Sequence, residues 1–107
     1  MRAVFAGPDT DGLAAALDAE GVEVTHVDGI ANRPALEECG IVDADLFVLT
    51  DVGQATAIPV AKDLNPDVKV VVYASDSLPE FASGQADLAI DPELLGAEAV
   101  AEELAAT

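Results

Sequence analysis

The stretch from Arg2 to Gly12 constrains the fold of this chain most strongly, because it joins an apolar run to a glycine turn. Residues 3–6 are apolar throughout, which is typical of a strand covered by helices on both faces of a sheet. Gly7-Pro8 ends that run, and apolar residues at helical spacing follow within residues 13–17. A buried strand followed at once by a helix predicts the start of a parallel α/β sheet.

The same alternation of a short apolar run and a helical pattern recurs to the end of the sequence. Strands are predicted at residues 3–6, 22–27, 46–49, 69–73 and 88–90, and helices at 13–20, 32–39, 56–64, 77–83 and 97–104. Five strands alternating with helices predict a three-layer α/β/α, Rossmann-like, parallel five-stranded sheet with right-handed crossovers. The 107 residues are expected to form one domain, residues 1–107.

Two strand orders fit these elements. Residues 22–27 alternate apolar with polar side chains, whereas residues 46–49 are apolar throughout. That difference suits the order 2-1-3-4-5, in which the second strand lies at an edge and the third is central. The family resemblance given below favours the order 3-2-1-4-5, which is the order preferred here, with 2-1-3-4-5 as the alternative.

The charge of the chain excludes several classes of partner. Four Lys and Arg residues stand against 21 Asp and Glu, a net charge of −17, while 51% of residues are hydrophobic, which is typical of a folded protein. Without a basic stripe, nucleic acid is not an expected partner. No segment is long and apolar enough to insert in a membrane, so a cytoplasmic location is expected. The composition resembles that of haloarchaeal proteins, whose acidic surfaces are screened by molar salt.

The turn after the first strand is a candidate phosphate site. Dinucleotide folds carry G-x-G-x-x-G there and an acid about 20 residues further on that binds the ribose. Gly7 and Gly12 match the first and third glycines, Asp28 matches the acid, and Asp9 stands in place of the middle glycine. Asp9 and Asp11 are also suited to cap the following helix, where they would occupy the electrostatic position of a phosphate. A nucleotide at this turn would need K⁺ or Mg²⁺ to bridge it to these acids.

Several segments together resemble the nucleotide-binding domain of the TrkA-N or RCK type. They are residues 7–12, 22–28, 40–50, 61–66 and 86–92. The resemblance implies a non-catalytic domain that binds NAD(H) or ATP, or a regulatory descendant that has lost the ligand. It places Gly7 and Gly12 at the phosphates and Asp28 at the ribose, and it sets Thr50 and Asp51 beside the adenosine.

Two alternatives use a flavodoxin-like or receiver-like scaffold instead. In a phosphoacceptor receiver, Asp51 would end the third strand and Ser75 would follow the fourth, but the chemistry needs adjacent carboxylates for Mg²⁺ and a lysine where this chain has Asp91. A protein-interaction module would pair with itself or with a partner through a helix face. No nucleophile with a base and no cluster of metal ligands is visible, so a catalytic role and a metal site are not expected.

Overall fold

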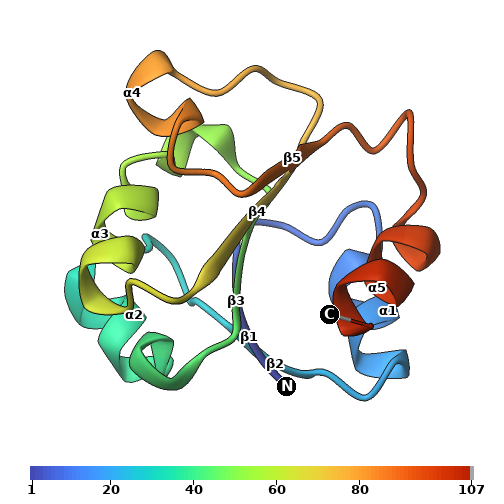
Figure 1. The fold of residues 1–107 in the computed structure, drawn as a ribbon, viewed down its shortest axis with the longest axis horizontal. Coiled ribbons are helices and arrows are strands. Elements are labelled where there is room, and N and C mark those ends of the chain that lie inside the picture. Colours follow the sequence, from blue (N-terminus) through green and yellow to red (C-terminus); the bar gives the residue numbers. More distant parts are fainter. Residues whose placement is uncertain (107) are drawn as a thin grey trace.

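The structure is a computed structural model that describes residues 1–106. It confirms the α/β class, with five parallel strands and helices on both faces of the sheet (Figure 1). The strands are β1 (Arg2–Ala6), β2 (Glu23–His26), β3 (Leu46–Leu49), β4 (Lys69–Tyr73) and β5 (Leu88–Ile90). The helices are α1 (Leu13–Ala19), α2 (Arg33–Glu38), α3 (Ala57–Leu64), α4 (Glu80–Ser83) and α5 (Ala97–Ala105), with 3-10 turns η1 (Ile41–Asp43) and η2 (Val52–Gln54).

The strand order is β2-β1-β3-β4-β5, so the preferred order 3-2-1-4-5 is wrong and the alternative 2-1-3-4-5 is correct. Strand β1 pairs in parallel with both β2 and β3, and Val4 lies opposite Thr25 on one side and Phe47 on the other. The burial of the two strands explains the order. All of β3 is buried, whereas β2 is largely exposed, as its alternating pattern requires of an edge strand.

The core lies in two layers, one on each face of the sheet. Side chains of β1 alternate between them: Phe5 packs with α1 and α5, and Val4 packs on the opposite face with α2, α3 and α4. Figure 1 shows α1 and α5 together on one side of the strands and α2, α3 and α4 on the other. Because both faces are covered, the inner strands are apolar apart from Arg2 and Lys69, which begin β1 and β4.

Helix α4 begins later than its sequence pattern predicts. Ser77 and Glu80 have the spacing of a capping box with Pro79 in the first turn, but the helix starts at Glu80 and no side chain caps it. Pro79 has an extended ψ of 150°, so the residues before Glu80 are outside the helix.

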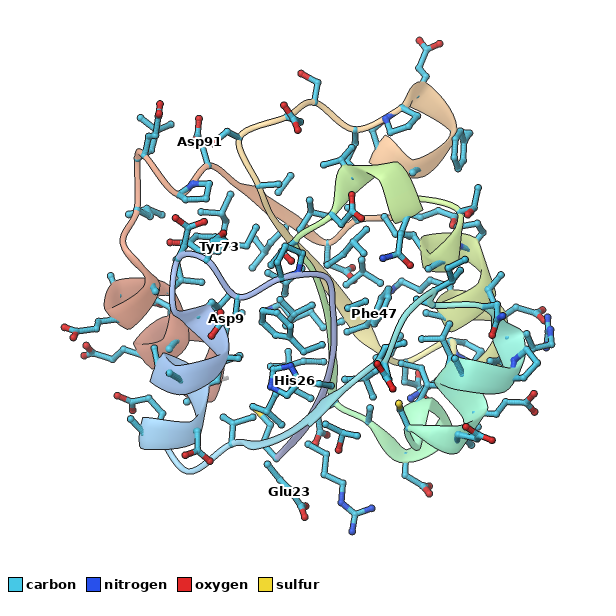
Figure 2. All side chains as sticks on the ribbon, turned by 180° about the vertical axis from the view of Figure 1, so that it is seen from behind. Asp9, Glu23, His26, Phe47, Tyr73 and Asp91 are labelled. Carbon is cyan, nitrogen blue, oxygen red and sulfur yellow. The ribbon has the colours of Figure 1, made fainter. Side chains whose placement is uncertain are left out.

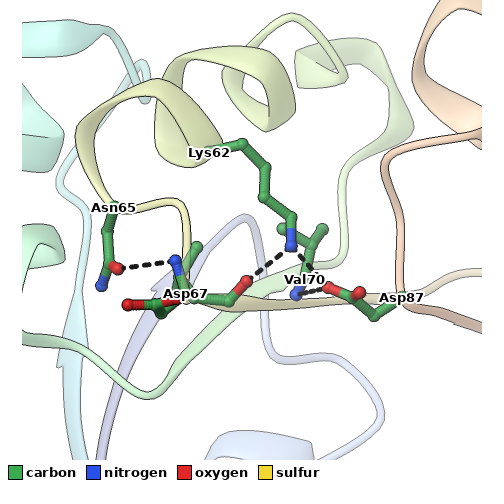
Figure 3. Close-up of polar contacts among 6 residues, drawn as sticks. Lys62, Asn65, Asp67, Val70 and Asp87 are labelled. Atoms are coloured by element: carbon green, nitrogen blue, oxygen red, sulfur yellow. Dashed lines mark hydrogen bonds and ion pairs between the residues drawn. The ribbon is translucent and has the colours of Figure 1, made fainter.

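A polar network fixes the start of β5 against β4 (Figure 3). The Asp87 carboxylate accepts hydrogen bonds from the Val70 amide (2.7 Å) and from the Lys62 ammonium (2.9 Å). Lys62 also donates to the Val68 carbonyl at 2.7 Å. Burial raises the pKa of Asp87, but these hydrogen bonds and the positive charges of Lys62 and Lys69 outweigh it, and the pKa lies below its ordinary value.

Asn65 ties the turn between α3 and β4 to the turn before β3. Its side-chain amide donates to the carbonyls of Ile41 and Ala44, both at 2.9 Å, and its oxygen accepts from the Asp67 amide at 3.1 Å. Asn65 is the buried polar residue of the described chain, and each of its polar side-chain atoms has a partner.

Candidate functional site

In a parallel α/β sheet, ligands bind beyond the carboxyl ends of the strands, where neighbouring loops diverge. With the order 2-1-3-4-5, that point lies between β1 and β3, and the loops there carry most of the residues predicted from the sequence. Figure 2 shows Asp9, Tyr73 and Asp91 toward this end of the molecule, with Glu23 at the opposite end.

Gly7 allows β1 and β3 to approach each other closely at this point. Its φ is +104°, and a Cβ added to it would overlap the Thr50 hydroxyl and lie 2.9 Å from the Asp51 amide nitrogen. The Thr50 hydroxyl in turn donates to the Pro8 carbonyl at 2.7 Å. The chain's own atoms therefore occupy the space beside Gly7, which gives this glycine a structural reason that needs no phosphate.

Of the two acids predicted to cap α1, Asp9 binds its first amides, whereas the Asp11 carboxylate accepts no hydrogen bond within residues 1–106. The Asp9 carboxylate accepts from the amides of Ala14 (2.9 Å) and Ala15 (3.4 Å). Gly12 precedes the helix with a φ of +80°, and no atom lies within 4 Å of a Cβ built on it, so its role is conformational. The helix amides that would bind a phosphate already bind a carboxylate.

Asp51 is engaged in the same way at the end of β3. One carboxylate oxygen accepts from the Gly53 amide at 2.9 Å, and the other accepts from the Gln54 side chain at 3.4 Å. Asp51 thereby caps η2. The Gln54 side-chain oxygen accepts from the Ala31 amide at 2.7 Å, which links this turn to the loop after β2.

The remaining candidate acids lie apart from this point. Asp28 is exposed after edge strand β2. Asp91 follows β5 and accepts from the Ser75 hydroxyl (3.3 Å) and the Glu93 amide (2.9 Å). Within residues 1–106 no three His, Cys, Asp or Glu side chains lie together in a way that could hold a metal ion.

Tyr73, the last residue of β4, combines a place in the core with a polar contact. It is 2% exposed at the end of β4, and its hydroxyl donates to the Leu95 carbonyl at 2.8 Å. Burial raises the pKa of Tyr73, and the charges of Asp11 and Asp91 raise it further. The sequence indicates this contact only by a tyrosine at the end of an apolar strand, because a buried phenol needs a hydrogen-bond partner.

An apolar groove beside β5 is the feature that the sequence did not reveal. Its volume is about 470 Å³. It lies between β5, the segment before α5, and α5 itself, and it is lined by Leu88, Ile90, Leu95, Ala99, Val100, Glu102, Glu103 and Leu104. Leu95 is 49% exposed and the adjacent Leu94 is 81% exposed. The only signal in the sequence is the Leu94-Leu95 pair between two predicted elements.

None of the helices in residues 1–106 has the length and hydropathy needed to cross a bilayer.

Several solved structures share this fold at 18% sequence identity. An orphan response regulator of H. pylori has a TM-score of 0.74, over 99% of this chain and 94% of that one. An atypical orphan response regulator has a TM-score of 0.73, over 99% and 93% of the two chains. A pilus assembly-related protein of Burkholderia pseudomallei has a TM-score of 0.69, over 99% and 90%. No curated protein matches the chain.

These comparisons overturn the resemblance to TrkA-N and RCK domains. The structural neighbours are receiver-like or pilus-assembly domains, and the strand order is the one that the resemblance argued against. The spacing of Gly7 and Gly12 was wrongly interpreted as a phosphate site. The close approach of the residues after β3 requires a glycine at position 7, just as a bound phosphate would. A family model matches residues 3–104, and the chain therefore belongs to the family of unknown function DUF7126.

Proposed function

We propose that this protein is a non-catalytic regulatory module that acts through contact with another protein, without phosphoryl transfer at Asp51 and without a bound nucleotide. The observation that carries the proposal is the closed carboxyl edge of the sheet. Asp9, Asp51 and Asp91 each bind backbone amides of their own loop or helix, and the Thr50 hydroxyl occupies the space beside Gly7.

Receiver chemistry lacks its other partners here. The turn after β1 begins Gly7-Pro8, and its nearest carboxylate, Asp9, binds amides of α1. Within residues 1–106, Asp51 is not part of a cluster of three acids that could hold Mg²⁺. Asp91 stands where a receiver needs a lysine, and its negative charge would oppose a phosphoryl group instead of stabilising it. These substitutions favour a module whose state does not depend on phosphorylation.

One of the structural neighbours supports this direction. The atypical orphan response regulator is described as having a phosphorylation-independent regulatory mechanism. That description belongs to the neighbour, and at 18% identity the likeness extends to this chain only as a scaffold. We infer that the same scaffold serves a phosphorylation-independent contact here.

An amide-resolved NMR titration tests the proposal. The protein would be titrated with acetyl phosphate and Mg²⁺, and separately with NAD⁺, NADH, ATP and AMP. We expect the spectrum to stay unchanged, because the amides that would bind phosphate already bind carboxylates. D51N is the control that distinguishes a specific reaction at Asp51 from acylation elsewhere.

Two results would contradict the proposal. Shifts centred on Asp51 that D51N abolishes would identify a working phosphoacceptor. Shifts centred on Gly7, Gly12, Asp28 and Thr50 would show that a nucleotide binds at the site predicted from the sequence.

A further inference from the structure

We propose that the groove between β5 and α5 is the docking site of a basic, amphipathic helix belonging to a partner protein. This inference rests on the proposed function, since it gives the protein contact a place and a chemistry. The groove joins exposed apolar side chains to a wall that carries Glu102 and Glu103, and no ion pair in residues 1–106 involves either glutamate.

The two walls of the groove differ in character. Leu88 and Ile90 point from β5 toward the α5 side, and Leu95 borders them while 49% exposed. On the other wall, Glu102 and Glu103 of α5 are both exposed at the rim. A helix with an apolar face and a lysine-rich or arginine-rich flank would contact both walls at once.

The charges of the chain argue against a second copy as the occupant. A symmetric contact through this groove would bring Glu102 and Glu103 of one copy close to those of the other. Three of the four Lys and Arg residues are already paired within the chain: Arg2 with Glu23, Arg33 with Asp63 and Lys62 with Asp87. Lys69, at the start of β4, forms no ion pair within residues 1–106, and this one lysine cannot balance both Glu102 and Glu103 of a second copy. A partner that supplies positive charge therefore fits better than a copy of the chain.

The probe is a helical peptide made of leucine and lysine, titrated into the isotope-labelled protein and followed by amide shifts. The salt concentration would be about 0.15 M, where the Debye length of about 8 Å leaves contacts at the rim unscreened. Two comparison peptides separate the apolar contribution to binding from the electrostatic one. A peptide of leucine and glutamate keeps the apolar face without the positive charge, and a peptide of serine and lysine keeps the positive charge without the apolar face. We expect shifts at residues 88–90, 95, 99 and 103, from the leucine–lysine peptide alone.

The double variant E102Q/E103Q removes the charged wall and leaves the apolar groove. Its matched control is E37Q/E38Q, because Glu37 and Glu38 are also adjacent, exposed and at the carboxyl end of a helix. Acids at that end oppose the helix dipole, so neither double variant should unfold its helix. We expect E102Q/E103Q to lower the affinity for the leucine–lysine peptide about three- to tenfold, as the loss of two exposed ion pairs predicts. E37Q/E38Q should leave that affinity unchanged.

Each other outcome overturns the docking site. Equal weakening by the two double variants would show attraction to net charge only. If the leucine–glutamate peptide bound as tightly as the leucine–lysine peptide, the partner would not need to be basic. If the molecular mass in solution rose with protein concentration, and L95S abolished that rise, the occupant of the groove would be a second copy. Absence of groove shifts would refute this site while the phosphate and nucleotide titrations still test the proposed function separately.

Discussion

The carboxyl edge of the sheet and the groove beside β5 contrast in how their side chains are used. At the carboxyl edge, Asp9 and Asp51 bind backbone amides, and Thr50 closes the space at Gly7. In the groove, the Leu95 side chain is half exposed. Polar residues at the usual ligand position thus bind the chain's own amides, whereas the groove beside the edge strand β5 exposes apolar side chains.

G7A should produce the largest effect and would test whether the carboxyl edge is closed. Alanine would adopt an unfavourable positive φ and overlap Thr50, so we expect the free energy of unfolding to fall by about 2–5 kcal/mol. G12A is the control, because Gly12 has a φ of +80° with open space around it. Urea unfolding of both variants measures the difference. Equal losses would mean that the approach of β3 to Gly7 is not tight.

D9A tests whether this acid has a structural role. Loss of its bonds to the Ala14 and Ala15 amides should lower the free energy of unfolding by about 1 kcal/mol and speed hydrogen exchange at those amides. Asp11 lies in the same turn and accepts no hydrogen bond within the described residues, so D11A is the control. Unchanged exchange in D9A would leave Asp9 free for a ligand.

D87N tests whether β5 is held at its amino end by Lys62 of α3, which packs on the face of the sheet opposite the groove. Because the Asp87 side chain is 41% exposed, solvent screens the pair, and we expect a loss of at most about 1 kcal/mol at neutral pH. The folded pKa lies below the ordinary 3.8, so this contribution is complete above about pH 4 and is lost as the pH falls through the folded pKa.

Urea unfolding from pH 7 to low pH should therefore show a shallower acid decline for D87N than for the parent protein. D63N is the control, because the pair of Asp63 with Arg33 is more exposed on both sides. A parallel decline in D87N and the parent would show that Asp87 has no shifted titration.

L95S should have the smallest effect on stability and completes the contrast. Its side chain is half exposed, and the hydrogen bond from Tyr73 goes to its backbone carbonyl, so we expect a change within about 0.5 kcal/mol. Thermal unfolding measures it, with the same variant used in the peptide titration. A large loss of stability would make the groove part of the core and remove the distinction between the two regions.

The residues themselves predicted the fold better than the family resemblance did. The alternation in residues 22–27 indicated an edge strand and the apolar run 46–49 a central one, and both are confirmed. The resemblance, which rested on the glycine turn at residues 7–12 and on four further segments, favoured the other order. The spacing of glycines indicates only that the backbone turns or that another group lies close to it. At Gly7 that group is the Thr50 hydroxyl, which is far away in sequence.

The candidate site was predictable only in part. The capping role of Asp9 follows from a local rule and is confirmed. The closure by Thr50 and the groove walls at Leu88 and Glu103 depend on which strands lie side by side, which no local pattern records. A nucleotide site at Gly7, Asp9, Gly12, Asp28, Thr50 and Asp51 stays a prediction that the titrations test.

The pairing of β1 has a kinetic consequence. Its second neighbour, β3, lies more than 40 residues along the chain, since Ala3 pairs with Leu46. The central strand must wait for a long loop to close, which slows folding relative to a helical bundle of the same size. The groove is completed later still in chain order, because β5 and α5 come last and α5 must pack on α1. A ligand of the groove would therefore bind only after β5 and α5 have packed on the earlier elements.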